Sequence, residues 1–270
     1  MKLVGRIEEV HDILYDALCY FDDFCKKKNI KYFLSNGTLL GAAKYGDFIP
    51  WDDDVDVLIP RDDYDKLMNM SDLSNDKYRL LCVEQISAWR MPYAKLSCEE
   101  TFVKEGEYNF GASFGLSIDI FPIDNWNPCA IIANFQSFQS EILKRLLVCS
   151  IGTDFYSKKT GLKRCILKSI WFIGKHIGYE RLQKMILRKA RKIKFKSKFV
   201  GCRVWTCHLN GEVFPSYFFN EVLYLRFRNR EFPTIKYYEA YLSNLYGNWK
   251  EELPIDMQHS NHEITVWYKL

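Results

Sequence analysis

Several features that would place a chain in a common class are missing from this sequence of 270 residues. It contains no run of 18 or more uncharged apolar residues, so no transmembrane helix is expected. Acidic residues fall within the N-terminal segment, MKLVGRIEEVHDIL, where a secretory signal peptide has its apolar centre. We therefore expect a soluble protein that stays in the cytoplasm.

The cysteine spacing of disulfide scaffolds and zinc sites is missing too. The nine cysteines are scattered, form no CxxC pair and have no histidines around them at zinc-ligand spacing. Their odd number favours reduced thiols, as in the cytoplasm. What the chain does have is 48% hydrophobic residues, which are enough to bury a large core and exclude a disordered chain.

Charge is unevenly distributed along the chain. The segment from Lys158 to Lys198 holds fifteen Lys or Arg and one acid, Glu180. The remaining residues include 23 basic and 33 acidic ones, so an acidic body carries one strongly basic segment. These two parts need separate functional explanations.

The spacing of apolar residues predicts a mixed α+β fold with one small sheet flanked by helices. An amphipathic helix is expected over 5–28, where apolar residues recur every three or four positions. Strands are expected at 32–34, 54–59, 78–83, 93–96 and 116–123. Further helices are expected at 38–45, 60–70, 130–150 and 161–195. The last seventy residues are rich in aromatics and turns, and their order is left open.

The densest group of acids is the run Trp51-Asp52-Asp53-Asp54-Val55-Asp56-Val57. Side chains repeat every second residue along a strand, so Asp52, Asp54 and Asp56 are expected on one face of an extended segment. Carboxylates this close repel one another unless a cation lies among them. A hard, oxygen-binding ion, Mg²⁺ or Mn²⁺, is the expected occupant.

Two other interpretations of this cluster compete with a metal site. A bare run of aspartates is usually a solvated loop, but the aliphatic residues that follow pull this one inward, where a carboxylate needs a partner. A calcium loop of the EF-hand type requires glycine at its sixth position, where this sequence has Val57, and the ninth position is Pro60. We favour the metal site over both.

A second predicted strand contributes one more carboxylate. Asp119 lies between aliphatic residues in segment 117–124, where the alternative is a buried polar residue paired with a base. Two acids on one strand and one on its neighbour is an arrangement by which transferases hold metal ions against a phosphate chain. Gly37-Thr38, just before a predicted helix, adds backbone N–H groups that can meet a phosphate.

These residues resemble the signature of the LicD family, which fukutin and fukutin-related protein share. The similarity begins with YFLSNGTLLGA at 32–42 and GDFIPWDDDVDV at 46–57. It continues through YAKL at 93–96 and IDIFPID at 118–124, and more loosely through 241–262. It covers residues 5–126 well and residues 213–265 weakly.

The resemblance implies a nucleotidyltransferase-like fold with a catalytic core over 1–130, a basic helical insertion over 131–200 and the rest of the same domain over 201–270. It also implies transfer of phosphocholine, or of a polyol phosphate, from a CDP-activated donor such as CDP-choline to a sugar of a cell-surface glycan. Lipopolysaccharide, capsule and teichoic acid are glycans of this kind. Lys44-Tyr45 stands where many members have Arg-His, and two residues separate His259 from His262, so donor or acceptor choice can differ.

Asp54 and Asp56 match the family's metal-binding pair, and Asp119 matches its third carboxylate. We expect these three to be catalytic and to hold Mg²⁺ or Mn²⁺, and we favour Asp119 over Asp52 as acceptor of the sugar hydroxyl's proton. Substrate-binding positions are expected at Gly37, Thr38, Lys44, Asp52, Lys95 and His262. Further cations near the acids in sequence are Arg61 and Arg90, and the nearest aromatics for a quaternary ammonium are Trp51 and Trp126.

The basic segment 158–198 mixes its cations with apolar residues such as Leu162, Trp171 and Leu187. Such helices suit an anionic membrane surface, while nucleic acid is the competing partner and packing on the body is the structural alternative. We prefer the membrane and no nucleic acid, because a glycan under construction usually sits on a lipid carrier. This places the protein in the cytoplasm, peripheral on the inner face of the membrane.

Two other functions are kept open. A DxD motif also binds nucleotide-sugars through Mn²⁺ in glycosyltransferases, but the N-terminal nucleotide-binding β-α-β unit of those enzymes is missing before Asp52. The other function is a non-catalytic metal-binding adaptor of the same fold. Retention of all three acids argues against an adaptor.

Overall fold

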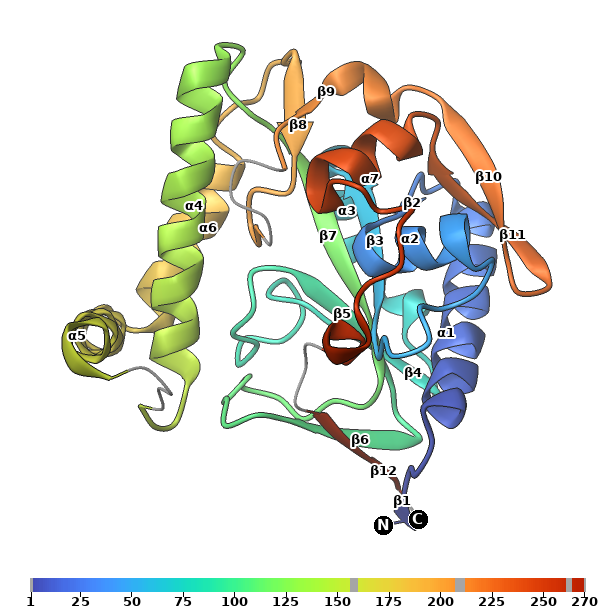
Figure 1. Ribbon diagram of the computed structural model, residues 1–270, viewed down its shortest axis with the longest axis horizontal. Helices are drawn as coiled ribbons and strands as arrows, with labels where there is room; N and C mark the ends of the chain where they lie inside the picture. The colour runs from blue at the N-terminus through green and yellow to red at the C-terminus, as the bar shows by residue number, and fades with distance from the viewer. Residues whose placement is uncertain (1, 156–159, 207–211, 261–263, 270) are drawn as a thin grey trace.

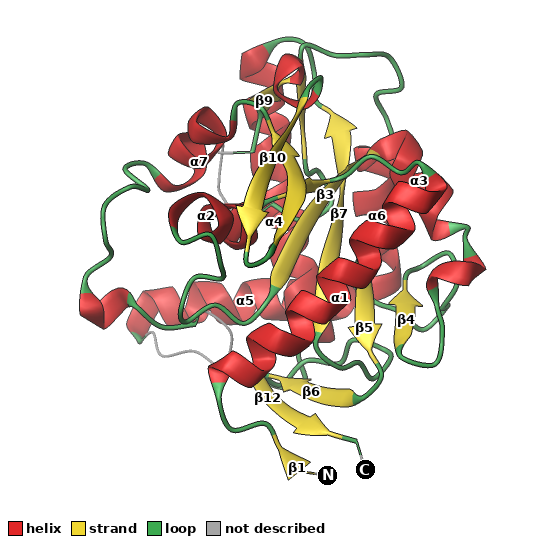
Figure 2. Ribbon diagram, turned by 90° about the vertical axis from the view of Figure 1, so that its right-hand side faces the viewer, coloured by secondary structure: helices red, strands yellow, loops and turns green. Residues whose placement is uncertain are grey.

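The computed structural model describes residues 2–155, 160–206, 212–260 and 264–269 and has the expected α+β architecture (Figure 1). A central sheet lies between helix α1 (Ile7–Lys28) and a layer of three helices on the other side. These three helices are α4 (Ala130–Ile151), α5 (Gly161–Ile177) and α6 (Tyr179–Ala190). Figure 2 shows α1 crossing one face of the sheet diagonally.

The central sheet has seven strands, and its main path runs in the order β2–β3–β7–β5–β4. These strands are β2 (Phe33–Leu34), β3 (Val55–Pro60), β4 (Tyr78–Leu81), β5 (Ala94–Cys98) and β7 (Ser117–Asn125). All five begin and end within two residues of the predicted positions. β7 lies at the centre and is buried along nearly its whole length, because elements cover both faces of the sheet.

The register of the sheet brings the predicted acids together. β3 runs parallel to β7 and places Asp56 beside Asp119. β5 runs antiparallel to β7 on its other side and places Lys95 beside the same Asp119. Asp52 differs from the prediction, because it lies in a turn before β3 in which its N–H donates to the carbonyl of Ile49 (2.9 Å).

Helix α1 has the charges that its ends favour. Glu8 and Glu9 lie in its first turn and three lysines lie in its last turn, which complements the helix dipole. Asn29 ends the helix in the left-handed conformation, with φ of 53°. Two shorter helices follow: α2 (Asn36–Lys44), which begins two residues earlier than predicted, and α3 (Arg61–Met68).

The helical stretches predicted at 130–150 and 161–195 form three helices rather than two. The second stretch breaks at Gly178, where φ is 81°, and ends at Ala190 instead of residue 195. The strands β8 (Phe199–Gly201) and β9 (Phe214–Pro215) follow, and β8 pairs with the end of β7. Along the chain, the three helices are therefore inserted between two paired strands of the same sheet, β7 and β8.

The C-terminal part, whose order the sequence left open, supports the sheet from the side of α2. It contains the hairpin β10 (Val222–Phe227) and β11 (Arg230–Ile235), followed by α7 (Tyr238–Tyr246). A small sheet joins β1 (Lys2–Leu3), β12 (Ile264–Tyr268) and β6 (Thr101–Glu105) (Figure 1). Short 3₁₀ turns occur at Ser71–Leu73, Ser216–Phe219 and Ile255–Met257. In the described part of the chain, no helix has the length and apolar character needed to cross a membrane.

Candidate functional site

Asp56 is a carboxyl of the acidic cluster with a strongly perturbed pKa. Burial raises its pKa well above the usual range, and the neighbouring carboxylates of Asp54, Asp119 and Asp52 raise it further. The side-chain amide of Asn36 hydrogen-bonds to Asp56 and acts in the opposite direction. Four acids from the turn, from β3 and from β7 therefore share one small region, and a cation would relieve their repulsion.

Lys95 is paired with the third predicted catalytic acid. Its Nζ lies 2.5 Å from Asp119 Oδ1, and both side chains are buried. Burial alone would lower the pKa of Lys95, but the charges of Asp119 and Glu105 raise it above its usual value. The ammonium also lies over the rings of Tyr93 (5.7 Å) and Phe114 (5.3 Å). Lys95 is therefore a charged group inside the site.

Gly37 is required by the position of Asp52. A Cβ atom on Gly37 would lie 2.5 Å from Asp52 Oδ2, which is too close for any side chain unless the carboxylate moves. The carbonyl of Asp52 accepts a hydrogen bond from His11 Nε2 (2.7 Å), and the imidazole stacks on Phe48 (4.3 Å). The start of α2 and the turn before β3 are thus fitted closely together.

Thr38 supports the acids rather than facing the open part of the site. Its side chain is buried, and Oγ1 accepts a hydrogen bond from the backbone N–H of Asp56 (2.8 Å). This hydrogen bond holds the start of β3 against α2. Asn36, just before it, links the site to α7, because Tyr241 donates to Asn36 Oδ1 (3.1 Å) while Asn36 bonds to Asp56.

Sequence reasoning missed two further contacts of the cluster. Ser260 donates to Asp53 Oδ2 (2.7 Å), which ties the C-terminal segment to the acidic run. Tyr241, in α7, is buried and reaches the site through Asn36. Both contacts join residues more than 200 positions apart, so no local pattern signals them.

The other predicted cations and aromatics are divided between the site and the rest of the fold. Lys44 donates to the carbonyl of Glu251 (2.7 Å) and pairs with Glu252 (3.3 Å), next to the cluster. Arg61 forms two 2.8 Å hydrogen bonds with Asp124, and Arg90 stacks on Tyr179 (4.3 Å), so both serve the fold. Trp126 is a core residue bonded to the carbonyl of Glu212 (3.1 Å). His262 lies outside the described residues.

The acids line a small cavity that adjoins two larger ones. The small cavity measures about 140 Å³ and is also lined by Lys95, Glu105, Tyr93, Phe121 and Trp205. It shares Asn36, Asp54 and Asp56 with a cavity of about 360 Å³. That second cavity is lined by the start of α2, by Lys44 and His259, and by the aromatic residues Tyr45, Trp51, Tyr246 and Trp249.

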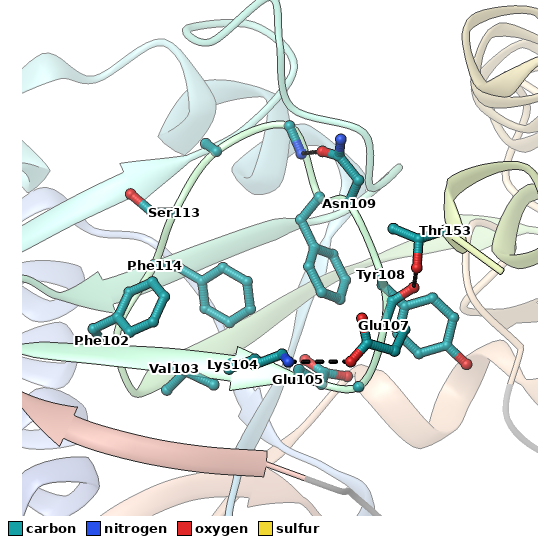
Figure 3. A pocket seen from close by; sticks show the side chains of 14 residues that line it. Phe102, Val103, Lys104, Glu105, Glu107, Tyr108, Asn109, Ser113, Phe114 and Thr153 are labelled. Carbon is teal, nitrogen blue, oxygen red and sulfur yellow. Dashed lines mark hydrogen bonds and ion pairs between the residues drawn. The ribbon is translucent and has the colours of Figure 1, made fainter. Parts of the chain in front are cut away.

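A third cavity, of about 490 Å³, adjoins the small cavity around the acids. Figure 3 shows the loop that follows β6 curving around it, with Lys104 paired to Glu107 (3.1 Å) and Thr153 bonded to the carbonyl of Glu107 (3.1 Å). Val103, Glu105 and Phe114 line both this cavity and the smaller one around the acids. The small cavity around the acids thus shares walls with both larger cavities.

The charges of the cluster fit a divalent cation, but the ligands are not assembled for one. Among the residues described, no three carboxylate, histidine or cysteine side chains converge closely enough to hold a metal ion as they stand. Burial, and after it the neighbouring carboxylates, raise the pKa of Asp56, whereas Asp119 is turned onto Lys95. Coordination by all three acids would require Asp119 to share its carboxylate between Lys95 and the ion.

Comparison with known proteins places this cluster in a recognised domain. Residues 29–145 match the sequence profile described as LicD/FKTN/FKRP, nucleotidyltransferase domain. The chain is 26% identical to the lipopolysaccharide cholinephosphotransferase LicD of Haemophilus influenzae over 278 positions, which cover 100% of this chain and 99% of the relative. It is 42% identical over 50 residues to an uncharacterized protein of Rickettsia prowazekii, covering 18% of this chain and 19% of that one.

A shorter match connects the chain to a human protein. Over 34 residues it is 56% identical to the human ribitol 5-phosphate transferase FKRP, which is 13% of this chain and 7% of the relative. The matched range 29–145 contains β3, β5 and β7 with Asp54, Asp56, Lys95 and Asp119. These matches identify residues 29–145 as a nucleotidyltransferase domain of the LicD/FKTN/FKRP family.

Proposed function

We propose that this protein transfers phosphocholine, or a related alcohol phosphate, from a CDP-activated donor to a sugar of a cell-surface glycan and releases CMP. The observation that carries the proposal is the pairing of Asp56 with Asp119 on adjacent parallel strands, among acids that raise the pKa of Asp56. The full-length similarity to a lipopolysaccharide cholinephosphotransferase supports phosphocholine, and the segment shared with a ribitol 5-phosphate transferase supports the wider class.

Asp54, Asp56 and Asp119 are the proposed ligands of Mg²⁺ or Mn²⁺. When bound there, such an ion neutralises the diphosphate of the donor and makes its distal phosphorus a better electrophile. The protein supplies carboxylates from β3 and β7, and the repulsion among these acids supports the proposal that an ion binds before another anion does.

The donor is proposed to occupy the 360 Å³ cavity beside α2. Backbone N–H groups at the start of α2, near Gly37, suit phosphate oxygens, and Lys44 contributes positive charge at the wall. Trp51 and Trp249 offer flat surfaces against which a cytosine ring can stack. Asp52, which lies against Gly37, lines the same cavity.

The acceptor is proposed to enter from the 490 Å³ cavity. This cavity adjoins the acids through Val103, Glu105 and Phe114, and in-line displacement requires the sugar hydroxyl to reach the phosphorus on the side opposite the bridging oxygen. A bond forms between the sugar oxygen and the distal phosphorus, the bond from that phosphorus to the bridging oxygen breaks, and the electron pair leaves with CMP. Asp119, which the Lys95 ammonium holds in place at 2.5 Å, accepts the hydroxyl proton.

We further propose that 1–130 and 201–270 form one catalytic domain into which residues 131–200 are inserted. The pairing of β8 with β7 supports this division, because the chain returns to the same sheet after the helical layer. We also propose that the protein works in the cytoplasm, peripheral on the inner face of the membrane, where a lipid-linked glycan would be its acceptor.

A direct test is to incubate purified protein with CDP-choline, CDP-ethanolamine, CDP-glycerol and CDP-ribitol in turn, with Mg²⁺ and native glycan, and to measure CMP release. Release from CDP-choline above the other donors, together with phosphocholine on the glycan, is expected. The Asp119→Asn variant serves as the control for hydrolysis by contaminants. Turnover of a nucleotide-sugar instead would favour a glycosyltransferase, and no turnover with any donor would favour a metal-binding adaptor.

A further inference from the structure

Helix α5 packs against the rest of the protein through only a small part of its surface. Within α5, all of which is described, only Gly174 is buried. A Cβ atom at Gly174 would lie 2.5 Å from the carbonyl oxygen of Leu146, so glycine allows α5 to rest directly on the backbone of α4. Figure 1 shows α5 at the outer edge of the molecule, separated from the sheet by the α4 layer. Most of the surface of α5 is therefore open to a partner.

The open surface of α5 is largely apolar. Leu162, Ile166 and Ile173 are exposed and spaced by four and seven residues, so they form one stripe along the helix. Leu162 is 77% exposed. Phe172 adds an exposed ring nearby on the same helix. A helix that packed its apolar side on its own domain would bury these residues, and α5 does not.

Helix α4, on which α5 rests, carries a second exposed apolar stripe. Ile131, Phe135, Phe138 and Ile142 are exposed and spaced by four, three and four residues, on the side away from the buried residues of α4. The stripe leads toward Leu146, on which α5 rests. We call these eight residues of both helices the α4–α5 platform: Ile131, Phe135, Phe138, Ile142, Leu162, Ile166, Phe172 and Ile173. Exposed apolar surface of this extent is typical of an interaction site.

The charge of α5 indicates which class of partner fits the α4–α5 platform. The helix carries Lys163, Arg164, Lys168 and Lys175 and contains no acid. A second copy placed with its own α5 on this surface would bring four positive charges against four. A nucleic acid would meet the charges but leave the apolar stripes uncovered. An anionic bilayer provides both the negative headgroups and the apolar phase.

Helix α6 behaves differently, although it belongs to the same basic segment. Leu182, Ile186 and Ala190 of α6 are buried in the body of the protein. At the end of the helix, Arg191 bonds to Asp65 (2.9 Å) and Glu84 (3.1 Å). Of the described helices of the basic segment 158–198, only α5 therefore remains a candidate for membrane contact, because α6 packs on the body. Helix α4, which the sequence did not single out, adds exposed apolar residues to those of α5.

We propose that the α4–α5 platform docks the protein on an anionic phospholipid surface. Its apolar side chains enter the boundary between headgroups and acyl chains, and Lys163, Arg164 and Lys168 of α5 contact the headgroup phosphates, while Lys175 is bonded to the carbonyls of Ser150 and Gly152. The proposal rests on the exposed stripes and the charge of α5 and is independent of the transfer chemistry. Binding to lipid is measured without any donor or acceptor, so it can fail while the proposed function holds.

Sedimentation with vesicles tests the platform. The full chain should bind vesicles of equal parts phosphatidylglycerol and phosphatidylcholine and bind pure phosphatidylcholine at least about tenfold more weakly, because each cation near an anionic surface contributes to binding. Phe135→Gln with Phe138→Gln should lower binding at least about tenfold, and the remaining binding should become more sensitive to salt. Arg164→Gln with Lys168→Gln should lower binding to a similar degree.

The matched control removes two charges from α6 instead. Lys184→Gln with Arg188→Gln changes exposed residues of the same type and should leave binding within about twofold. Equal loss in this control would show that total charge, and not the platform, attracts the protein. Equal binding to neutral vesicles, or no binding at low salt, overturns the proposal. So does a concentration-dependent dimer in analytical ultracentrifugation that the Phe135 and Phe138 changes abolish, because the platform would then be a contact between two copies.

Discussion

The ammonium of Lys95 lies 2.5 Å from Asp119 Oδ1, and Asp119 stands beside Asp56 on the neighbouring strand. One carboxylate of the cluster is therefore neutralised by the protein itself, while Asp56, with a raised pKa, is not. This difference separates the acids into one that the fold has already paired and others whose charge needs an external cation.

Removal of single negative charges should stop turnover and leave the fold intact. Asp54→Asn, Asp56→Asn and Asp119→Asn are each expected to lower kcat by about a hundredfold or more, because each would remove a group that positions a metal ion. Steady-state CMP release and circular dichroism measure the two properties together. Asp76→Asn, an exposed acid outside the cluster, is the control. Near-normal kinetics in any of the three variants would remove that residue from the site.

Divalent metal should be required for activity and should stabilise the fold. Excess chelator is expected to abolish turnover, and Mg²⁺ or Mn²⁺ is expected to restore it. At a metal concentration a hundred times its Kd, binding adds about 2.7 kcal/mol to the free energy of unfolding. That corresponds to a rise in Tm of roughly 5–10 °C in a calorimetric scan. Asp56→Asn should lose most of this rise, and full turnover in chelator would contradict the prediction.

Tyr241 is expected to support catalysis through Asn36 without touching the acids. Tyr241→Phe removes the hydroxyl that bonds to Asn36 Oδ1, so the amide that holds Asp56 becomes less well fixed. We expect about 1 kcal/mol lower stability and about tenfold lower kcat. Urea unfolding and CMP release measure both. Tyr237→Phe, at an exposed ring just before α7, should change neither; equal effects of the two changes would refute this role for Tyr241.

The stability of the protein should depend on pH through His11. Burial is the main cause that lowers the pKa of His11 below its usual 6.5, so the native protein favours neutral imidazole. The unfolded chain then binds more protons than the native one, and stability falls as pH drops below about 6.5. Urea unfolding at pH 7.5 and pH 5 should show this loss for the natural sequence and a smaller one for His11→Gln. His176→Gln, at an exposed helical position, is the control.

Much of the fold was predictable because its signals are local. The strand with Asp56 and the strand with Asp119 each alternate acids with aliphatic residues, and both lie where that pattern placed them. Their close approach follows from pairing two buried strands in one sheet. Helix α1 was predicted from a local signal too, because its apolar residues recur at helical spacing over about six turns.

The supporting contacts of the site were not predictable from local pattern. Tyr241 reaches Asn36, and Ser260 reaches Asp53, across more than 200 residues of chain. Thr38 resembles a phosphate-contacting hydroxyl in sequence, yet it accepts the N–H of Asp56 because α2 packs directly on β3. The turn at Asp52 likewise depends on the close approach of Gly37, which only the folded chain shows.

The separation of the central acids is determined by the backbone. Asp56 and Asp119 occupy paired positions on adjacent strands, and strands in a sheet lie about 4.8 Å apart. The hydrogen bonds of the ladder keep this interval constant whatever side chains surround it. The walls of the adjoining cavities, in contrast, come largely from the loop after β6 and from the C-terminal segments. Mutations in these walls can therefore change the substrates of such a scaffold over evolutionary time, while the distance between the paired strand positions of its two central acids stays the same.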